Sequence, residues 1–328
     1  MSSSEIHENF DEEISYATVK RLLSNLLKEK LISTSGQGKA TRYRISPSYL
    51  ILRPIDMDSY YQKEIDDRVV QTNFNFDLIS KILPKIELFK ASELLHLDSL
   101  QKKFKKKTKV LSRLEFEKEL ERLAIDLSWK SSQIEGNTYT LLETERLLKQ
   151  NETASGRTKE EAIMLLNHKE AIDLIVKHTD YLFPLSPSKI EEVHGILIKN
   201  LGIDKSIRRG RVGITGTRYT PLDNEYQIND ALRDMCVLVN RKKNIFEKAL
   251  LTLLLISYIQ PFVDGNKRTA RIVSNSMFIK HQHCPLSFRT VDSLEYKKAM
   301  LIFYEQNNIS CFKEIFIQQV EFAVETYF

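Results

Sequence analysis

The sequence has little cysteine, glycine or proline, and each shortage excludes a class of protein. Its 328 residues include three cysteines, which are scattered and show no CxxC spacing. Neither a disulfide framework nor a zinc site is indicated, and a reducing cytoplasm suits such a chain best. The 10 glycines and 8 prolines leave long segments between them. Because most of these segments space their apolar residues with helical periodicity, we predict a mainly α fold.

Long apolar runs are absent as well. The first residues, MSSSEIHENFDEE, are polar and acidic, whereas a secretory signal has a basic start and an apolar middle. The longest apolar run, from Ala249 to Ile259, is shorter than the roughly 20 residues of a membrane span and predicts a buried core helix. We therefore expect a soluble, cytoplasmic protein without membrane contact.

Charge of one sign is in only slight excess. The chain has 49 Lys and Arg against 44 Asp and Glu, which gives a net charge of +5. This favours a nucleotide or nucleic-acid partner without requiring one. The clearest basic run is QKKFKKKTK at 101–109, with six lysines. Such a run is usually a solvated face or a linker, and nucleic-acid contact is the less favoured alternative.

Residues 1–50 have the pattern of a small separate module. Ser15 is a suitable N-cap for a helix that runs to about Lys30 with a stripe of leucines on one face. Gly36 and Gly38 then turn a basic hairpin. The phrase ATVKRLLSNLLKEKLI, followed by GQGKATRYRI, resembles winged-helix DNA-binding domains, so we predict a winged-helix-like α+β module.

In such domains the recognition helix enters the major groove with its N-terminal polar side chains, and the wing adds basic ones. The corresponding residues here are Ser15, Tyr16, Thr18, Lys20 and Arg21 in the helix, and Lys39, Arg42 and Arg44 in the wing. The alternative is a module that packs against a neighbouring domain or a second subunit without touching DNA. Only about 14 residues precede the helix, too few for the usual two supporting helices, and this favours the alternative.

The remaining chain divides into a predicted helical connector at 51–112, which carries no motif, and a main domain at 113–328. The strongest chemical signal in that domain is IQPFVDGNKRTAR at 259–271, which opens a helix directly after the apolar run. A helix start presents free backbone N–H groups and a positive dipole end, both suited to phosphate. Its side chains fit the same ligand: two arginines three positions apart on one face can hold phosphates, Gly265 allows close approach, and a carboxylate can bind Mg²⁺.

This stretch resembles the signature of the Fic family, histidine-P-F-x-acid-G-N-(G or K)-R-x-x-R, at every defining position except the first. The resemblance implies a Fic helical bundle, ATP as the donor, and transfer of AMP to a Ser, Thr or Tyr hydroxyl of a target protein. It also implies roles for single residues: Mg²⁺ binding by Asp264, an anion hole from Gly265, Asn266 and Lys267, the β-phosphate for Arg268 and the γ-phosphate for Arg271, with Asn266 and Arg268 among the catalytic residues.

Two positions depart from the family pattern. Gln260 stands where the family has its catalytic histidine, and a neutral amide cannot take a proton from the attacking hydroxyl. General-base help is worth about 10² to 10⁴ in rate, so we expect transfer to be impaired while binding survives. Degeneration into a nucleotide-binding regulator, an introduced substitution and rescue by another base all remain open. Lys267 replaces a glycine of many adenylylating members and is closer to the Doc branch, which phosphorylates.

The segment SSQIEGN at 131–137 resembles the inhibitory motif of the Fic family, with Ser131, Glu135 and Gly136 in place. Its position before the core is that of the class with an internal N-terminal inhibitory helix, here near 125–137. The resemblance implies that Glu135 pairs with Arg271, withdraws the guanidinium from the γ-phosphate and acts as a brake. The alternative is an ordinary surface charge on a helix.

Residues 207–222, IRRGRVGITGTRYTPL, are the clearly non-helical stretch of the main domain. The alternation through Val212 and Ile214 and the turn at Gly216 predict a β-hairpin. This hairpin is similar to the Fic flap, whose exposed edge pairs with the backbone of the target.

Three hypotheses follow from these patterns. The first is an autoinhibited AMP-transferase scaffold without its general base. The second is a DNA-binding regulator whose degenerate Fic core senses nucleotide, and the third is a Doc-like kinase. Because members of the family often form dimers that affect the brake, a homodimer is also open.

Overall fold

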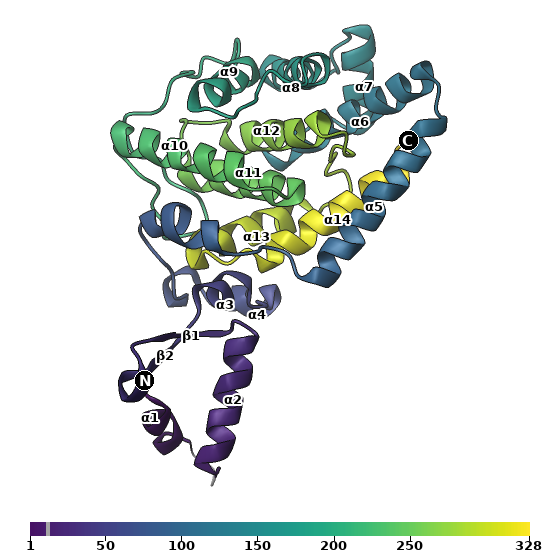
Figure 1. Cartoon of the computed structure of the whole chain (residues 1–328). Helices are drawn as coiled ribbons and strands as arrows, with labels where there is room; N and C mark the ends of the chain where they lie inside the picture. Colours follow the sequence, from purple (N-terminus) through teal and green to yellow (C-terminus); the bar gives the residue numbers. More distant parts are fainter. Residues whose placement is uncertain (11–13) are drawn as a thin grey trace.

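The structure is a computed structural model that describes residues 1–10 and 14–328, without the side chain of Lys39. Lys39, expected in the basic wing, therefore lies outside the described side chains. A small N-terminal module is joined to a much larger helical body (Figure 1). Helices dominate, and the strands of the described residues form one two-stranded sheet. The prediction of a mainly α fold with a small α+β module is confirmed.

The N-terminal module contains helix α1 (Ser3–Glu8), helix α2 (Tyr16–Lys28) and the strands β1 (Ile32–Ser35) and β2 (Arg42–Ile45). The strands pair antiparallel, with Ile32 opposite Ile45. Ser15 caps α2, because its Oγ accepts a hydrogen bond from the backbone N–H of Thr18 at 3.2 Å. The predicted helix and hairpin are thus confirmed, and within the described residues one short helix precedes them.

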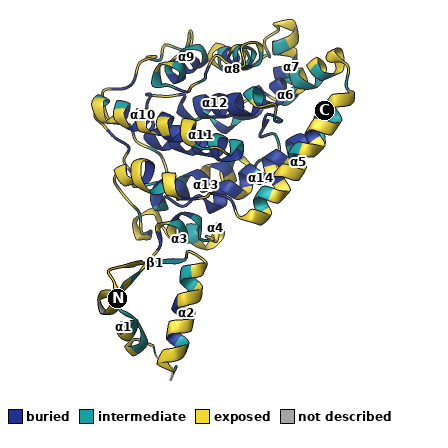
Figure 2. Ribbon diagram, in the orientation of Figure 1, coloured by how far each residue is buried: buried dark blue, intermediate teal, exposed yellow. Residues whose placement is uncertain are grey.

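The module buries little apolar surface of its own. Val19 and Leu23 are the buried side chains of α2, and most of the module is exposed or half-buried (Figure 2). A core of this size is too small to stabilise a folded unit alone. The module continues into α3 (Pro47–Leu52), whose Ile51 is 4% exposed and belongs to the core of the main body.

The connector differs from its predicted helical form. It contains α3, α4 (Met57–Tyr61) and the long helix α5 (Ala91–Val110), but residues 62–90 hold only single turns, at Ile65–Asp67, Leu78–Ile82 and Leu83–Lys85. The helical prediction is wrong for this middle part. Its backbone bonds to distant segments instead, since the N–H of Gln71 donates to Glu305 O at 2.8 Å. Such bonds replace those of a helix. The boundaries near residues 50 and 112 stay predictions.

The main body is a helical bundle around α11 (Ile245–Ile259), which packs against α10 (Glu225–Arg241), α12 (Asn266–Lys280) and α13 (Ser293–Gln306). Every residue from Ala249 to Ile259 is buried, so this run is the core helix that the sequence predicts. The other helices of the body are α6 (Arg113–Ile134), α7 (Leu141–Gln150), α8 (Lys159–Lys177), α9 (Pro187–Leu197) and α14 (Ser310–Thr326) (Figure 1). None of the described helices has both the length and the apolar character needed to cross a membrane.

The segment 207–222 does not form the predicted β-hairpin. It is free of helix and turns at Gly216, where φ is +89°, but no strand pairing occurs within it in the described structure. Its polar groups bind elsewhere: the N–H of Arg208 donates to Pro261 O at 3.0 Å, and Thr220 forms an isolated parallel bridge with Asn73. Alternating apolar residues predict extended backbone but not its partner, and here the partners lie outside the segment.

Replacing Leu254 by alanine tests the central place of α11. Leu254 is fully buried, so Leu254→Ala loses transfer free energy and leaves a cavity, and we expect a loss of about 2–5 kcal/mol of stability. Leu142→Ala is the matched control, because Leu142 is 76% exposed and its truncation changes stability by less than about 0.5 kcal/mol. Urea unfolding followed by circular dichroism measures both. Equal effects would contradict the packing described for α11.

Candidate functional site

A cleft of about 500 Å³ opens where the loop between α11 and α12 meets the end of α6, helix α13 and residues 213–215. Residues of the two predicted motifs line this cleft: Glu135, Gln260, Asp264, Gly265, Asn266 and Lys267. Helix α13 adds a wall of mixed character, made of Leu294, Lys297, Met300, Leu301 and Tyr304. Two motifs that lie far apart in the sequence are therefore neighbours in the structure.

The loop between α11 and α12 is closed by the side chain of Asn266. Its Oδ1 accepts a hydrogen bond from the N–H of Phe262 at 2.9 Å, and its Nδ2 donates to Phe262 O at 2.8 Å and to Gln260 Oε1 at 2.9 Å. Gln260 ends α11 in a left-handed conformation, with φ +51°. A single buried amide thus fixes the shape of the loop.

Both ends of the Gln260 side chain are used inside the protein. Its Nε2 donates to Ser257 O at 2.7 Å, while its Oε1 accepts from Asn266. Its backbone oxygen accepts from Nε of Arg208 at 2.6 Å. Gln260 is 9% exposed, so it faces the cleft as a neutral group that already has its hydrogen-bond partners.

Gly265 begins α12 with φ +79°, a conformation that favours glycine. A Cβ at this position would lie 3.3 Å from both His194 Cδ2 and Ile198 Cγ2, so the backbone approaches α9 closely. His194 Nε2 donates to Asp264 O at 2.9 Å, and burial lowers the pKa of this ring. The helix start, with its free N–H groups, is held at the cleft by these contacts.

Arg268 is a buried cation, 1% exposed, beneath the start of α12. Its Nη2 donates to Asp264 Oδ2 at 3.1 Å, while its Nε and Nη1 have no hydrogen-bond partner in the described structure. The side chain of Asp264 is 62% exposed and reaches into the cleft. The pair therefore offers a carboxylate to solvent and leaves two buried donors unused.

Arg271 is fully buried and forms hydrogen bonds with residues at the end of α6. Its Nε donates to Ser131 Oγ at 2.7 Å, and its Nη2 donates to Ser131 O at 2.9 Å and to Glu135 Oε1 at 2.8 Å. The guanidinium also lies 5.4 Å from the ring centre of Tyr296. Its Nη1 has no partner in the described part of the chain.

Glu135 lies at the end of α6, between Arg271 and a second cation. Its other oxygen is 3.6 Å from Lys267 Nζ. Burial alone raises the pKa of Glu135, but Arg271 and Lys267 outweigh burial and hold the pKa below its ordinary value of 4.5. Gly136 follows with φ +102° and turns the chain away from the helix. At neutral pH an ionised carboxylate therefore occupies one side of Arg271.

The unused donors fit a bound anion. Buried N–H groups almost always have acceptors, but Nε and Nη1 of Arg268 and Nη1 of Arg271 have none in the described structure. Both side chains lie beneath the residues that line the cleft and are not part of its lining. Phosphate oxygens are the acceptors that guanidinium forks bind best. Among the described residues, no group of three or more His, Cys, Asp or Glu is placed to hold a metal ion.

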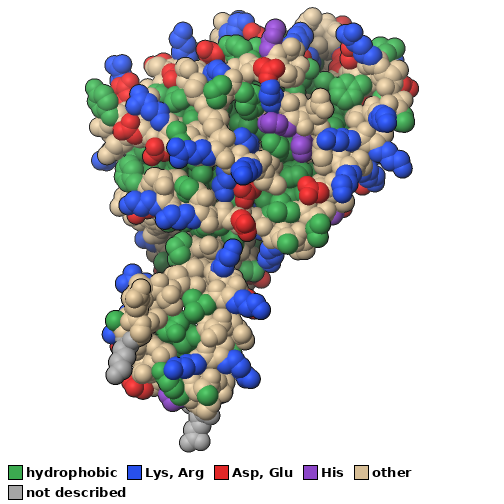
Figure 3. Space-filling model, viewed as in Figure 1, with side chains coloured by type: hydrophobic (Ala, Val, Ile, Leu, Met, Phe, Trp, Pro, Cys, Tyr) green, Lys and Arg blue, Asp and Glu red, His purple; other side chains and the backbone are tan. Residues whose placement is uncertain are grey.

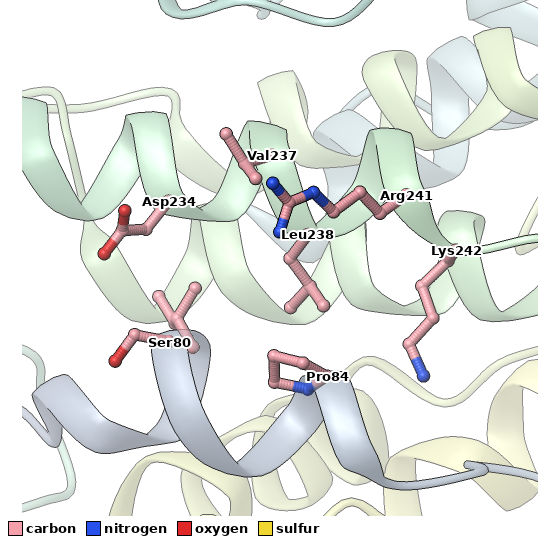
Figure 4. Close-up of a pocket in the computed structure, with 8 residues that line it drawn as sticks. Ser80, Pro84, Asp234, Val237, Leu238, Arg241 and Lys242 are labelled. Atoms are coloured by element: carbon pink, nitrogen blue, oxygen red, sulfur yellow. The ribbon is translucent and has the colours of Figure 1, made fainter.

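A separate hollow of about 290 Å³ lies between α10 and the turns at 78–85 (Figure 4). It is lined partly by the charged residues Asp234, Arg241 and Lys242, and Lys242 is already paired with Glu247 at 3.2 Å. No residue of either motif reaches it. The cleft beside α12 is therefore the candidate site.

Comparison with known proteins finds a family match in each of two parts of the chain. Residues 184–278 match the Fic/DOC family, and residues 1–72 match the penicillinase repressor family. Residues 184–278 are thus similar to Fic domains. Protein adenylyltransferase fic-1 of Caenorhabditis elegans is 26% identical over 179 residues, which are 51% of this chain and 34% of that protein. Protein adenylyltransferase Fic of Nematostella vectensis is 29% identical over 181 residues, which are 51% of this chain and 40% of that protein. The chain thus spans two fifths or less of the length of these relatives.

Solved structures share the fold. Fic-1 of Caenorhabditis elegans superposes with a TM-score of 0.62 at 20% identity and covers 72% of each chain. A Fic domain containing signalling protein of Bacteroides thetaiotaomicron superposes with a TM-score of 0.57 at 20% identity, over 70% of this chain and 96% of that chain. The predicted resemblance to the Fic family and to winged-helix modules is therefore confirmed, whereas the roles of the single site residues stay predictions.

Three side chains at or near the candidate site carry no sequence signal. Arg208 holds the backbone of Gln260, and Tyr304 lines the cleft with a buried hydroxyl that has no partner in the described structure. His168 on α8 is fully buried with both ring nitrogens unpaired there. Burial, with Arg271 nearby, lowers the pKa of His168 well below its usual range, so the ring is neutral.

The pairing of Glu135 with Arg271 predicts a pH-dependent stability. Because the folded-state pKa of Glu135 lies below 4.5, the ion pair stabilises the fold above that pH and is lost as the pH falls through the folded-state value. We expect Glu135→Gln to lower the thermal midpoint at pH 7, and the difference from the unchanged chain to shrink below pH 4.5. Glu145→Gln, at an exposed i, i+4 pair with Lys149, is the control. A difference that stays constant down to acid pH would refute the pairing.

Proposed function

We propose that the Fic domain binds ATP with Mg²⁺ in the cleft and is built to transfer AMP to a Ser, Thr or Tyr hydroxyl of a target protein. The observation that carries this proposal is the pair of buried guanidinium groups with unused donors, next to the exposed carboxylate of Asp264. The names of the two adenylyltransferase relatives support the same reaction class. Three free, buried cysteines support a cytoplasmic location.

In this proposal the start of α12 binds the phosphates of ATP. The backbone N–H groups at Gly265, Asn266 and Lys267 form the anion hole, Arg268 holds the β-phosphate and Arg271 the γ-phosphate. Asp264 holds Mg²⁺, which supplies charge neutralisation for the phosphates when bound.

The transfer step requires an acceptor for one proton. The oxygen of the target hydroxyl bonds to the α-phosphorus, the bond to pyrophosphate breaks, and the hydroxyl proton must leave. Gln260 cannot take that proton, because an amide is not basic and its oxygen already accepts from Asn266. We infer that the chain binds the donor well but transfers AMP poorly.

Glu135 acts as a brake in this proposal. Its carboxylate already occupies one side of Arg271, at 2.8 Å, and competes with the γ-phosphate for the same donors. While Glu135 occupies Arg271, bound ATP cannot form all the hydrogen bonds between its γ-phosphate and the Arg271 guanidinium. Removal of the carboxylate frees that guanidinium for the nucleotide.

Restoring the base and removing the brake is the direct test. With α-labelled ATP, Mg²⁺ and host lysate as acceptor, we expect Gln260→His combined with Glu135→Gly to label protein about 10² to 10⁴ times faster than Glu135→Gly alone. Calorimetry should show Mg·ATP binding to the Glu135→Gly chain, more tightly than to the unchanged chain. Absence of binding in both chains would rule the proposal out. Labelling from γ-labelled rather than α-labelled ATP would instead identify a Doc-like kinase, the alternative that Lys267 raises.

A second function, DNA binding by the N-terminal module, is favoured by the match to the penicillinase repressor family. Arg42 and Arg44 of β2 are exposed, although Arg42 also lies 3.8 Å from Glu5. Lys and Arg side chains are spread among acidic ones over the face in Figure 3 rather than gathered into one patch. A DNA contact would therefore depend on α2 and the wing. In this alternative, the degenerate Fic core senses nucleotide and the N-terminal module binds DNA, so that the chain acts as a DNA-binding regulator.

Binding of a duplex DNA probe tests this function. Because phosphate contacts release counterions, we expect affinity to fall steeply with salt, and Arg42→Ala with Arg44→Ala to weaken binding and reduce the salt slope by about 1 for each lost phosphate contact. Lys177→Ala, at an exposed position of α8, is the control for net charge. If the probe does not bind, or if its affinity does not depend on salt, the module does not bind DNA and serves only to pack against another domain or subunit. A homodimer of the chain remains a separate prediction.

A further inference from the structure

Arg68 is a connector residue whose buried side chain reaches the extended segment beside the cleft. It is 3% exposed and follows the turn at Ile65–Asp67. Its Nη2 donates to Gly216 O at 2.9 Å, and its Nη1 donates to Glu305 Oε2 at 3.3 Å. One guanidinium group therefore joins the connector both to the segment 207–222 and to the end of α13.

Both partners of Arg68 directly follow residues that line the cleft. Gly216 comes after Thr215, and Glu305 comes after Tyr304. The segment also lies close against α13, because a Cβ at Gly216 would be 3.2 Å from a side-chain atom of that helix. Arg68 is thus bonded to residues that adjoin the rim of the cleft.

The connector holds the same segment at two further points. Nη2 of Arg218 donates to the backbone oxygen of Arg68 at 2.6 Å, and the N–H of Thr220 donates to Thr72 O at 2.7 Å. These bonds fix residues 216–220. The backbone at 213–215 therefore lines the cleft next to residues that are held in place on its C-terminal side.

The geometry requires an arginine at this position. The Arg68 fork serves two acceptors in different directions, and a lysine ammonium on a flexible stem does not reproduce that planar arrangement. Glu305, 1% exposed, also accepts from the hydroxyl of Tyr60 at 2.5 Å. Burial, together with Glu305, raises the pKa of Tyr60, so this hydroxyl remains a donor. The buried carboxylate of Glu305, which accepts hydrogen bonds from both Tyr60 and Arg68, therefore fixes the position of the guanidinium group.

We propose that Arg68 is a positioning residue for the protein target. Arg68 holds residues 213–218 against α13, so that the backbone of a target protein docks against a fixed segment. Arg68 thereby affects the rate at which target proteins are labelled but not the affinity for ATP. The proposal rests on the proposed function, since it assumes that a protein docks beside the cleft. The proposed phosphate site is built from residues of α6 and 260–271, and none of these residues bonds to Arg68.

Hydrogen exchange on the full chain tests whether Arg68 holds the segment. Arg68→Met removes the donor to Gly216 O, and we expect the amides of Tyr219 and Thr220 to exchange about tenfold to hundredfold faster, with the amides of α11 unchanged. Arg233→Met is the matched control, because Arg233 is an exposed arginine paired with Asp230. Unchanged exchange in Arg68→Met would overturn the proposal.

A second variant separates positioning from simple charge neutralisation. Arg68→Met leaves Glu305 as a buried unpaired charge, which by itself destabilises a fold. Arg68→Met with Glu305→Gln removes that charge but still lacks the donor to Gly216. We expect the segment to stay loosened in this double variant. Restored protection would overturn the proposal, because Arg68 would then serve only to neutralise Glu305.

Target use and nucleotide binding are then compared in the chain that carries Gln260→His and Glu135→Gly. Adding Arg68→Met with Glu305→Gln should lower labelling of lysate proteins from α-labelled ATP by about tenfold to hundredfold, while the Kd for Mg·ATP stays within about twofold. An equal loss of ATP affinity contradicts the proposal. If the chain with intact Arg68 labels nothing, the proposed function fails, and the exchange experiment still decides the role of Arg68.

Discussion

The burial of two guanidinium groups at the start of α12 is the constraint on which the rest of the site depends. Arg268 is 1% and Arg271 0% exposed, and neither side chain can lose its proton near neutral pH. Buried charges are tolerated only with opposite charges and hydrogen bonds around them. Ser131 and Glu135 supply these for Arg271, and Asp264 does so for Arg268. Some N–H groups of both guanidinium groups stay unpaired in the described structure, and the proposed function assigns phosphate oxygens to them.

In the proposed function, Glu135 and the nucleotide would compete for one buried charge, that of Arg271. Glu135 neutralises the charge of Arg271, so the buried guanidinium is not an isolated cation. Lys267 adds a second cation 3.6 Å from the same carboxylate, at a position where many adenylylating Fic members have glycine. The departure that points toward the Doc branch thus also strengthens the hold on Glu135.

Sequence reasoning reaches those parts of the site whose residues act within one loop or one helical turn. The segment 259–271 could be interpreted from local geometry, and the apolar run before it from composition. The contact between Glu135 and Arg271 joins two helices, and only a family resemblance pointed to it. Arg68 has no signal at all, because its partners lie 148 and 237 positions away. The hairpin predicted at 207–222 is wrong for the same reason: alternation reports extended backbone, whereas pairing depends on distant partners.

Position 260 shows that the structural and the chemical duties of a motif residue can be separated. Asn266 closes the loop through the backbone of Phe262, and its third hydrogen bond goes to Gln260 Oε1. Arg208 holds the backbone oxygen of Gln260, which any residue supplies. The loop to which we assign phosphate binding therefore does not need a histidine for its shape, whereas removal of the hydroxyl proton in the proposed transfer does need a base. A chain with this loop and an amide at position 260 can keep its anion site intact while the step that depends on proton transfer is slow.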